Sequence, residues 1–400
     1  MLRYRGLFPG RALRLLSAAV LCAAALQAAG GQTIIPARIV LRLLPGAVIG
    51  DVLSDYNLSL TGQVAGRDLY EVRAATTTDM GTLVEELTAD SRIQFAEEES
   101  RVELPEVKGH PFHVAFDASP NGSRYVNQAA YTQIDLGTAA QTTGPATIVA
   151  VLDTGVNRQH KSLAGKILGG YNAISPRQEP NDVPDGKTNA AAGHGTMVAG
   201  IVVRVSPHAR IMPVRVLDAD GAGSMLHVLQ GIHYAVTHGA RIINMSFGTS
   251  APSLALEDAL SEADDARVLL VASAGNDGSA SPHYPAAYPD VIAVASVGAK
   301  MQRSSFSNFG SYIAVDAPGD GVRSTYWTGG YATGTGTSFS TPFVTGEASE
   351  IMARYPQWDT GSISDRIRET ALPIDSLNPG YALQLGAGLI DVQMALKRGN

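Results

Sequence analysis

The chain has 400 residues, of which 45% are apolar and 17% charged, and its formal net charge is −7 at pH 7. This length and apolar content are sufficient for one large hydrophobic core and a smaller second unit. The mild acidity gives no basis for binding nucleic acid or an anionic membrane. Because Cys22 is the single cysteine, the chain cannot form an internal disulfide.

The first thirty residues have the composition of a secretory signal peptide. Arginines at positions 3, 5, 11 and 14 precede an apolar run from Leu15 to Leu26, and small residues follow at positions 28–30. A basic region, an apolar region and small residues, in that order, are typical of a segment that is removed on export. We therefore assign residues 1–30 as a signal peptide, with an uncleaved membrane anchor as the alternative.

Residues 33–106 predict a small α+β unit. Strands are expected at 37–43, 58–64, 68–74 and 93–104, and helices at 48–56 and 80–89. This βαββαβ order is that of the ferredoxin-like fold. The unit has no obvious catalytic cluster, and we interpret its acidic run, Glu97 to Glu99, as a solvated strand end. Residues 107–145 are polar and predict a linker with one short helix near 128–134.

Residues 146–400 alternate between strand and helix patterns. Continuous apolar strands are expected at 147–152, 210–216, 241–245, 268–272 and 291–297. Helices are expected at 194–203, 225–238, 254–265 and 343–355, the last with Pro342 in its first turn. This alternation predicts an α/β fold with a doubly wound, mostly parallel sheet and helices on both faces.

Four polar residues lie where such a fold places its sites. Asp153 ends a predicted strand, His194 begins a predicted helix, Asn276 follows another strand, and Ser338 lies in a Gly- and Thr-rich turn before a helix. A serine there lies near free backbone N–H groups that can stabilise an oxyanion. Each residue alone has an ordinary explanation in turns or helix caps. Together they follow the order Asp, His, Ser, which is one of the chain orders of the catalytic triad.

The residues around these positions resemble the signature blocks of the subtilisin-like serine proteases, the subtilases. The resemblance covers about residues 148–395, and its blocks are Val151–Gly155, His194–Gly200, Asn244–Gly248, Ala274–Asn276, Gly336–Pro342 and Gly386–Ile390. It implies a seven-stranded sheet and a serine-type endopeptidase that acts through an acyl-enzyme. Residues 33–106 similarly resemble a subtilase propeptide, which assists folding and then inhibits the enzyme.

The resemblance and the chemistry of the side chains assign the roles together. Ser338 would be the nucleophile, His194 the general base, and Asp153 the group that orients the imidazole. Asn276 and the backbone N–H of Ser338 would form the oxyanion hole. Substrates are expected to add an extended strand between two edges. The implied substrate-binding residues are Gly221, Ala222, Gly223, Ser246, Phe247 and Gly248, with Ser273, Ala274, Gly275 and His283 around the pocket for the residue before the scissile bond.

Some positions depart from the family's pattern. Phe339 and Phe343 replace the usual Met and His around the serine, and Thr345 and Glu347 replace small or apolar residues in the following helix. The segment after His194 also lacks the inserted loop that carries a high-affinity calcium site in the family. We therefore expect no metal ligands and no required cofactor, and leave structural calcium open.

The sequence thus predicts a secreted serine endopeptidase, periplasmic or extracellular, that is made as a self-processed zymogen and acts as a monomer. Its expected partners are extended polypeptides and its own propeptide, with no nucleic acid and no membrane after signal removal. The predicted preference before the scissile bond is for apolar or aromatic residues. Two alternatives stay open: a catalytically silent subtilase fold that binds proteins, and a protease dedicated to one partner.

Overall fold

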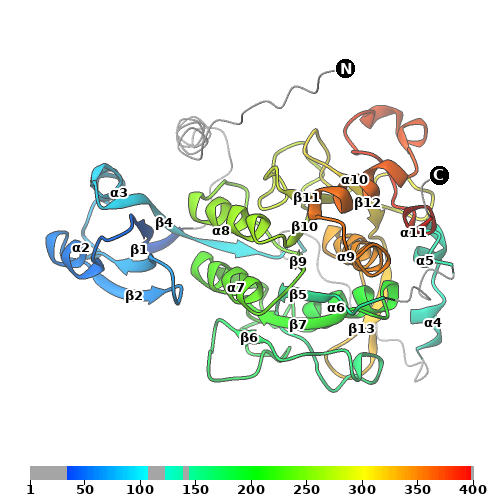
Figure 1. Ribbon diagram of the computed structural model, residues 1–400, viewed down its shortest axis with the longest axis horizontal. Coiled ribbons are helices and arrows are strands. Elements are labelled where there is room, and N and C mark those ends of the chain that lie inside the picture. The colour runs from blue at the N-terminus through cyan, green and yellow to red at the C-terminus, as the bar shows by residue number, and fades with distance from the viewer. Residues whose placement is uncertain (1–33, 107–121, 138–143, 398–400) are drawn as a thin grey trace.

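The computed structural model describes residues 34–106, 122–137 and 144–397 (Figure 1). The predicted signal peptide, including Cys22, and much of the predicted linker lie outside these ranges. None of the helices within the ranges is long and apolar enough to cross a membrane.

A seven-stranded parallel sheet forms the centre of the larger part of the molecule. Its strand order is β12-β11-β10-β9-β5-β7-β6. The strands are β5 (Ile148–Asp153), β6 (Tyr171–Asn172), β7 (Arg210–Arg215), β9 (Ile242–Met245), β10 (Leu269–Ser273), β11 (Val291–Val297) and β12 (Val315–Pro318). The predicted α/β fold and seven-stranded sheet are therefore confirmed. β6 and β12 were not predicted individually, because strands of 2 and 4 residues carry little hydrophobic pattern.

Helices cover both faces of this sheet, as predicted. α6 (His194–Val205) and α9 (Thr337–Arg354) pack on one face, and α7 (Met225–Thr237) and α8 (Leu254–Asp265) on the other (Figure 1). In β5, Val149 and Val151 join the core beneath α6 and α9, whereas Ala150 and Leu152 join the core beneath α7 and α8. Successive side chains of a strand point to opposite faces, so a strand covered on both faces reads as a continuous apolar run.

Shorter elements complete the larger part. The helices α4 and α5 precede β5, the strands β13 and β14 form an antiparallel hairpin, and α10 and α11 follow α9. Their bounds are α4 Ser123–Val126, α5 Ala129–Gln133, β13 Val322–Thr325, β14 Tyr331–Gly334, α10 Thr360–Thr370 and α11 Val392–Leu396.

Helix α9 begins earlier than the sequence predicts. It starts at Thr337 rather than Phe343, so Pro342 lies inside the helix instead of in its first turn. Proline has no N–H, so the carbonyl of Ser338, four residues earlier, loses its helical donor. The Ser246 hydroxyl donates to this carbonyl at 3.0 Å. A residue beyond the end of β9 thus compensates for the proline, which the local sequence does not reveal.

The smaller part is an α+β unit with its own core. Its elements are β1 (Ile34–Leu43), α2 (Ile49–Asp55), β2 (Ser59–Gln63), β3 (Leu69–Arg73), α3 (Met80–Ala89) and β4 (Ile93–Glu103). They follow in βαββαβ order, and the antiparallel strands are arranged β2-β3-β1-β4. The end of β4 pairs with β8 (Ala222–Ser224), so this sheet continues into the larger part (Figure 1).

Two glutamates of β4 lie at this junction, which corrects the interpretation of Glu97 to Glu99 as a solvated strand end. Glu97 accepts hydrogen bonds from the Ser253 hydroxyl at 2.5 Å and the Leu254 N–H at 2.8 Å, at the start of α8. Glu99 is fully buried and accepts from the Leu226 N–H at 3.1 Å, in the first turn of α7. The first N–H groups of a helix lack helical partners, so an oxygen that accepts hydrogen bonds from them is favourable.

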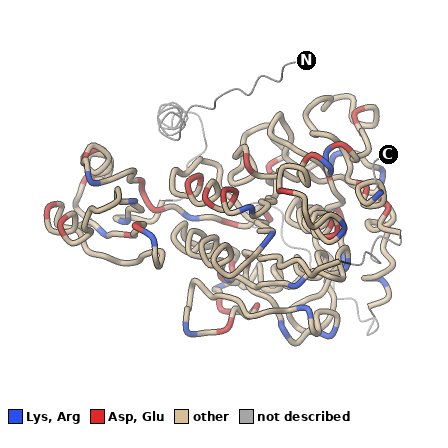
Figure 2. Tube along the Cα trace, in the orientation of Figure 1, with Lys and Arg blue, Asp and Glu red and all other residues tan. Residues whose placement is uncertain are grey.

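Ion pairs surround this junction on the side of α8. Arg42 pairs with Asp258 and, at 2.8 Å, with Glu262, while Arg67 lies 3.0 Å from Glu262. Figure 2 marks several acidic positions along α8. Partly exposed ion pairs contribute only about 0–1 kcal/mol each. They therefore orient the smaller unit, and the shared apolar core supplies most of the attraction.

We predict that the folded chain loses stability as Glu99 ionises. Burial raises the pKa of Glu99 from 4.5 to about 8, against the lowering effect of the Leu226 N–H, and nearby Glu71 raises it further. Because the folded pKa lies above the unfolded one, the stability from the protonated carboxyl is fully present below pH 4.5 and lost as the pH approaches 8. Glu99→Gln should therefore flatten the fall in melting temperature across this range.

The measurement is thermal unfolding of the full chain in a Ser338→Ala background, which removes the predicted nucleophile. Glu98→Gln, in the same strand, is the matched control. Equal pH slopes for the Glu99→Gln and Glu98→Gln proteins would show that the junction does not titrate as described.

Candidate active site

The four predicted catalytic residues converge at the carboxyl end of the parallel sheet. Asp153 ends β5, His194 begins α6, Asn276 follows β10, and Ser338 lies in the first turn of α9. Asp153, His194 and Ser338 are fully buried, and Asn276 is 7% exposed. This is the sheet edge at which open α/β folds place their sites.

The Asp153 carboxylate holds the His194 imidazole. Nδ1 of His194 lies 2.8 and 2.9 Å from the two carboxylate oxygens, which favours the tautomer with the proton on Nδ1. Burial lowers the pKa of His194, but the nearby carboxylates, Asp153 foremost, outweigh it and raise the pKa overall. A Cβ at Gly195 would lie 2.2 Å from the Gly155 carbonyl, so only glycine lets α6 approach the Asp153 turn this closely.

The Asn276 amide is fixed by the start of α9. Its Oδ1 accepts from the Thr337 N–H at 3.0 Å and from the Thr337 hydroxyl at 2.8 Å. Nδ2 therefore faces the opposite way and donates to a carboxylate oxygen of Glu106 at 3.0 Å. This orientation is the one that an oxyanion donor requires.

Glu106 is the site residue that the sequence did not predict. Its second carboxylate oxygen accepts from Ser338 Oγ at 2.8 Å and lies 3.7 Å from His194 Nε2. The side chain is buried, which raises its pKa, while His194, Ser338 and Asn276 favour the ionised form. A carboxylate thus lies where an oxyanion beside Ser338 would form. The sequence feature that could have identified Glu106 is its position shortly after the last strand of the unit that resembles a propeptide.

The two predicted substrate edges flank a strand of the same chain. Val102 and Glu103 pair with Gly223 and Ala222, and the Leu104 N–H donates to the Gly221 carbonyl at 2.9 Å. On the other side, Glu103 and Gly248 exchange backbone hydrogen bonds of 3.1 and 2.9 Å. Both edges therefore accept an extended segment, and this segment leads directly to Glu106.

The remaining predicted pocket residues lie beside the second edge. Ser273 ends β10 and is buried with Ala274. A Cβ at Gly248 would lie 2.3 Å from His283 Nε2, and one at Gly275 would lie 3.0 Å from His283 Cγ. The His283 ring thus contacts both Gly248 and Gly275, and glycine at these positions leaves room for it. Phe247 is fully buried in the core beneath α7 and α8.

One departure from the family pattern supports the site. The Thr345 hydroxyl donates to Asn244 Oδ1 at 2.8 Å, and Asn244 Nδ2 donates to the Ser246 hydroxyl at 2.9 Å. Ser246 in turn donates to the Ser338 carbonyl. A chain of hydrogen bonds thus extends from Thr345 to the backbone of Ser338.

The other departures lie in the core of α9. Phe339 packs near the His194 ring at 5.3 Å between centroids, and Phe343 near Tyr131 at 5.6 Å. Burial raises the pKa of Glu347 well above its ordinary value, which favours the neutral carboxyl. Nothing in the structure explains why a carboxyl group is present there.

The described ranges contain no group of three or more His, Cys, Asp or Glu side chains suited to a metal ion. The calcium requirement of the whole chain stays a prediction.

The comparisons with known proteins show the family of the chain. Residues 144–388 match the model of the subtilase family. The thermostable alkaline protease of Halalkalibacterium halodurans is 39% identical over 267 residues, which are 64% of this chain and 69% of that protein. Subtilisin amylosacchariticus of Bacillus subtilis subsp. amylosacchariticus is 33% identical over 358 residues, which are 86% and 85% of the two chains.

A solved structure supports the fold. Fervidolysin from Fervidobacterium pennivorans, described as a keratinolytic enzyme related to subtilisin, aligns with a TM-score of 0.74 at 24% identity. The alignment covers 92% of this chain and 61% of fervidolysin. Taken with the family match, these similarities place the chain in the subtilase family. It is a serine-type endopeptidase, and its substrates are polypeptides.

We predict that the activity resists mild peroxide. The residue after Ser338 is Phe339, so the nucleophile has no adjacent thioether that oxidation could convert to a bulky polar sulfoxide. Residual hydrolysis after timed peroxide exposure measures this. Phe339→Met is the matched control and should lose activity quickly under the same treatment. Rapid loss in the unmodified protein, with no difference between the two, would contradict the prediction.

Proposed function

We propose that the chain is a secreted serine endopeptidase that is made as a zymogen and hydrolyses extended polypeptides through Asp153, His194 and Ser338. One observation carries the proposal. The Glu106 carboxylate receives hydrogen bonds from both Ser338 Oγ and Asn276 Nδ2, at 2.8 and 3.0 Å. The nucleophile and the amide donor thus converge on one carboxylate, and the amide donates to its oxygen as it would to the oxyanion of a tetrahedral intermediate.

In the first half of the reaction, Ser338 Oγ attacks the carbonyl carbon of the scissile peptide bond. His194 Nε2 accepts the hydroxyl proton, and Asp153 stabilises the resulting imidazolium. The electron pair of the carbonyl π bond moves to oxygen. The resulting oxyanion would accept hydrogen bonds from Asn276 Nδ2 and from the backbone N–H of Ser338. A preorganised donor of this kind typically contributes about 10²–10³ in kcat.

Collapse of this intermediate breaks the C–N bond, and His194 donates its proton to the leaving amine. The acyl group is then an ester of Ser338. In the second half, a water molecule attacks this ester while His194 Nε2 accepts a water proton. Collapse of the second tetrahedral intermediate returns that proton to Ser338 Oγ and releases the carboxylic acid product.

The zymogen part of the proposal rests on the segment Val102–Glu106. This segment lies between the two edges that substrates are expected to use, and its backbone bonds to Gly221 and Gly248 imitate those of an added strand. The group that Ser338 Oγ contacts in this segment is the Glu106 side-chain carboxylate, which occupies the space beside the nucleophile that a substrate would need. Residues 34–106 would therefore inhibit until self-processing separates them.

Export, the monomeric state and the preference for apolar or aromatic residues before the scissile bond are parts of the same proposal. Export is supported by the basic and apolar composition of residues 1–30. The binding-module alternative is less well supported, because it gives no reason for the four side chains to converge.

We predict that the chain processes itself and that Ser338 is required. The unmodified chain and Ser338→Ala, both expressed without residues 1–30, are compared by mass spectrometry of the intact proteins. The unmodified chain should lose roughly seventy to one hundred residues from its N-terminus, as the position of the predicted propeptide requires, and Ser338→Ala should stay whole. If both stay whole and folded and neither hydrolyses casein, the binding-module alternative takes its place.

A further inference from the structure

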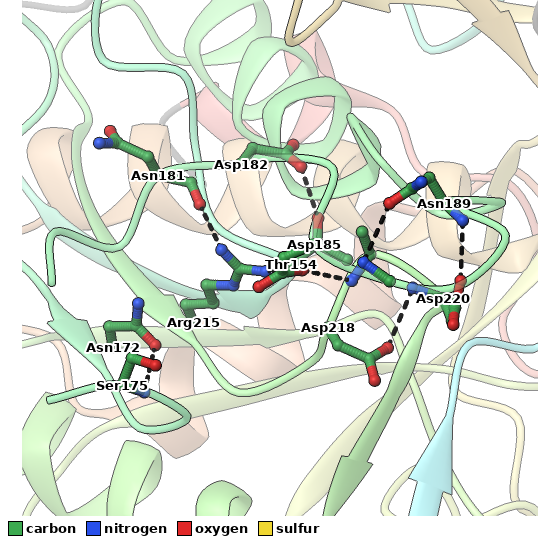
Figure 3. A network of polar contacts seen from close by, with 12 residues as sticks. Thr154, Asn172, Ser175, Asn181, Asp182, Asp185, Asn189, Arg215, Asp218 and Asp220 are labelled. Atoms are coloured by element: carbon green, nitrogen blue, oxygen red, sulfur yellow. Dashed lines mark hydrogen bonds and ion pairs between the residues drawn. The ribbon is translucent and has the colours of Figure 1, made fainter.

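A buried aspartate outside the predicted site lies behind the Asp153–His194 pair. Asp182 is 3% exposed and lies on the long loop from β6, twelve positions before His194, the first residue of α6. Its Oδ1 accepts from the Gly193 N–H at 2.8 Å and from the Thr154 hydroxyl at 3.2 Å. Its Oδ2 accepts from the Thr196 hydroxyl at 2.7 Å and from the Thr196 N–H at 3.1 Å. Figure 3 shows Asp182 above Thr154.

These contacts join the two elements that carry the catalytic pair. Thr154 directly follows Asp153, whereas Gly193 and Thr196 flank His194 at the start of α6. The Thr154 hydroxyl also accepts from the Gly195 N–H at 3.0 Å. The carboxylate thus bonds to the turn after β5 and to the first turn of α6 at once.

Asp182 also supplies the cap that α6 lacks locally. The residue before α6 is Gly193, which has no side chain to accept hydrogen bonds from the first N–H groups. An anion at this end is favoured by these N–H groups and by the helix dipole. The helix start is therefore held by a residue from another loop.

We propose that Asp182 is a positioning residue for catalysis, which fixes the Asp153 turn against the His194 turn and stabilises the imidazolium that forms during the reaction. The inference rests on the proposed roles of Asp153 and His194. Asp182 does not replace a member of the triad, since its described contacts are to Thr154, Gly193 and Thr196.

The charges around His194 agree with this role. The carboxylates facing His194 are Asp153, Glu106 and Asp182, and each raises its pKa. Burial raises the pKa of Asp182 itself to about 6, although the bonds from Thr196 and Gly193 oppose this, and Asp153 adds to it. Tyr326 is a further titratable neighbour of Asp182. Above about pH 6, Asp182 therefore adds a negative charge next to the imidazole.

The decisive variant is Asp182→Asn, which keeps the size of the side chain but removes the charge and places an N–H₂ among donors. We expect kcat/KM at alkaline pH to fall about 10- to 100-fold through kcat, since small misplacement of catalytic groups has effects of this size. The acid limb of the kcat/KM profile should also move to lower pH. The base must be neutral to accept a proton, and losing a nearby anion lowers the pKa of His194.

Asp185→Asn is the matched control for stability. Asp185 belongs to the same loop and accepts from the buried Arg215 at 2.5 Å and from the Ala219 N–H at 3.2 Å (Figure 3). The main influences on the pKa of His194 are burial and the carboxylates of Asp153, Glu106 and Asp182. Asp185→Asn should lower the melting temperature but leave the acid limb of the kcat/KM profile at the same pH.

If Asp182→Asn folds poorly, a second pair of variants tests the hydrogen bonds that join Asp182, Thr154 and Gly195. Thr154→Val removes the hydroxyl between Asp182 and Gly195, and Thr154→Ser retains it. Thr154→Val should lower kcat, whereas Thr154→Ser should keep most of the kcat of the unmodified enzyme.

The inference is overturned if the unmodified enzyme is active while Asp182→Asn keeps both its kcat and its acid limb. It is equally overturned if Asp182→Asn and Asp185→Asn lose activity only in proportion to their melting temperatures. Failure of the proposed function looks different, because the unmodified protein would then show no hydrolysis that His194→Ala abolishes.

Discussion

The contact between the Asp153 carboxylate and the His194 imidazole requires a closely packed and fully hydrogen-bonded environment. Both groups are fully buried, and a buried ionised group is costly unless it is paired and hydrogen-bonded. One oxygen of Asp153 also accepts from the Thr154 N–H at 2.7 Å. The end of a central strand and the start of α6 must therefore meet within hydrogen-bond distance, and Gly195 is the residue that permits this approach.

Much of the irregular structure in the larger part serves this meeting of strand end and helix start. Asp182 joins the two turns from behind, and Ser246 replaces the helical hydrogen bond that Pro342 cannot donate. The nucleophile thus lies at the start of a long helix whose interrupted hydrogen bond is supplied by a neighbouring strand end. Asp182 and Ser246 thus hold backbone turns in place through hydrogen bonds and are not themselves reacting groups.

The same site concentrates negative charge. Asp153, Asp182 and Glu106 all face one imidazole, and like charges in a buried region repel one another. An imidazolium balances them best, so the covered site favours protonated His194. Removal of Glu106 would lower the pKa of His194. More of the imidazole would then be neutral at neutral pH, as a general base requires. The segment that ends at Glu106 thereby affects the electrostatics of the site as well as access to it.

The sequence predicted the parts of this structure that depend on pattern or local chemistry. Continuous apolar runs such as 147–152 identified strands buried on both faces, and strand ends or glycine-rich turns identified Asp153, His194, Asn276 and Ser338. It did not predict Glu106, Asp182, the burial of Glu99 or the contacts of Glu97 with the start of α8, because the partners of these carboxylates lie far away in the sequence. The early start of α9 was missed for the same reason, since the donor that tolerates Pro342 comes from Ser246.

The central claim is that a complete acyl-transfer site is present and that Glu106 covers it. Labelling with a fluorophosphonate, followed by peptide mapping, tests this most directly. We expect the label on Ser338, no labelling in His194→Ala, and faster labelling of the unprocessed Glu106→Ala chain than of the unprocessed Glu103→Ala chain, which loses a carboxylate from the same segment. Label on another residue, or equal rates for the two glutamate variants, would contradict the account.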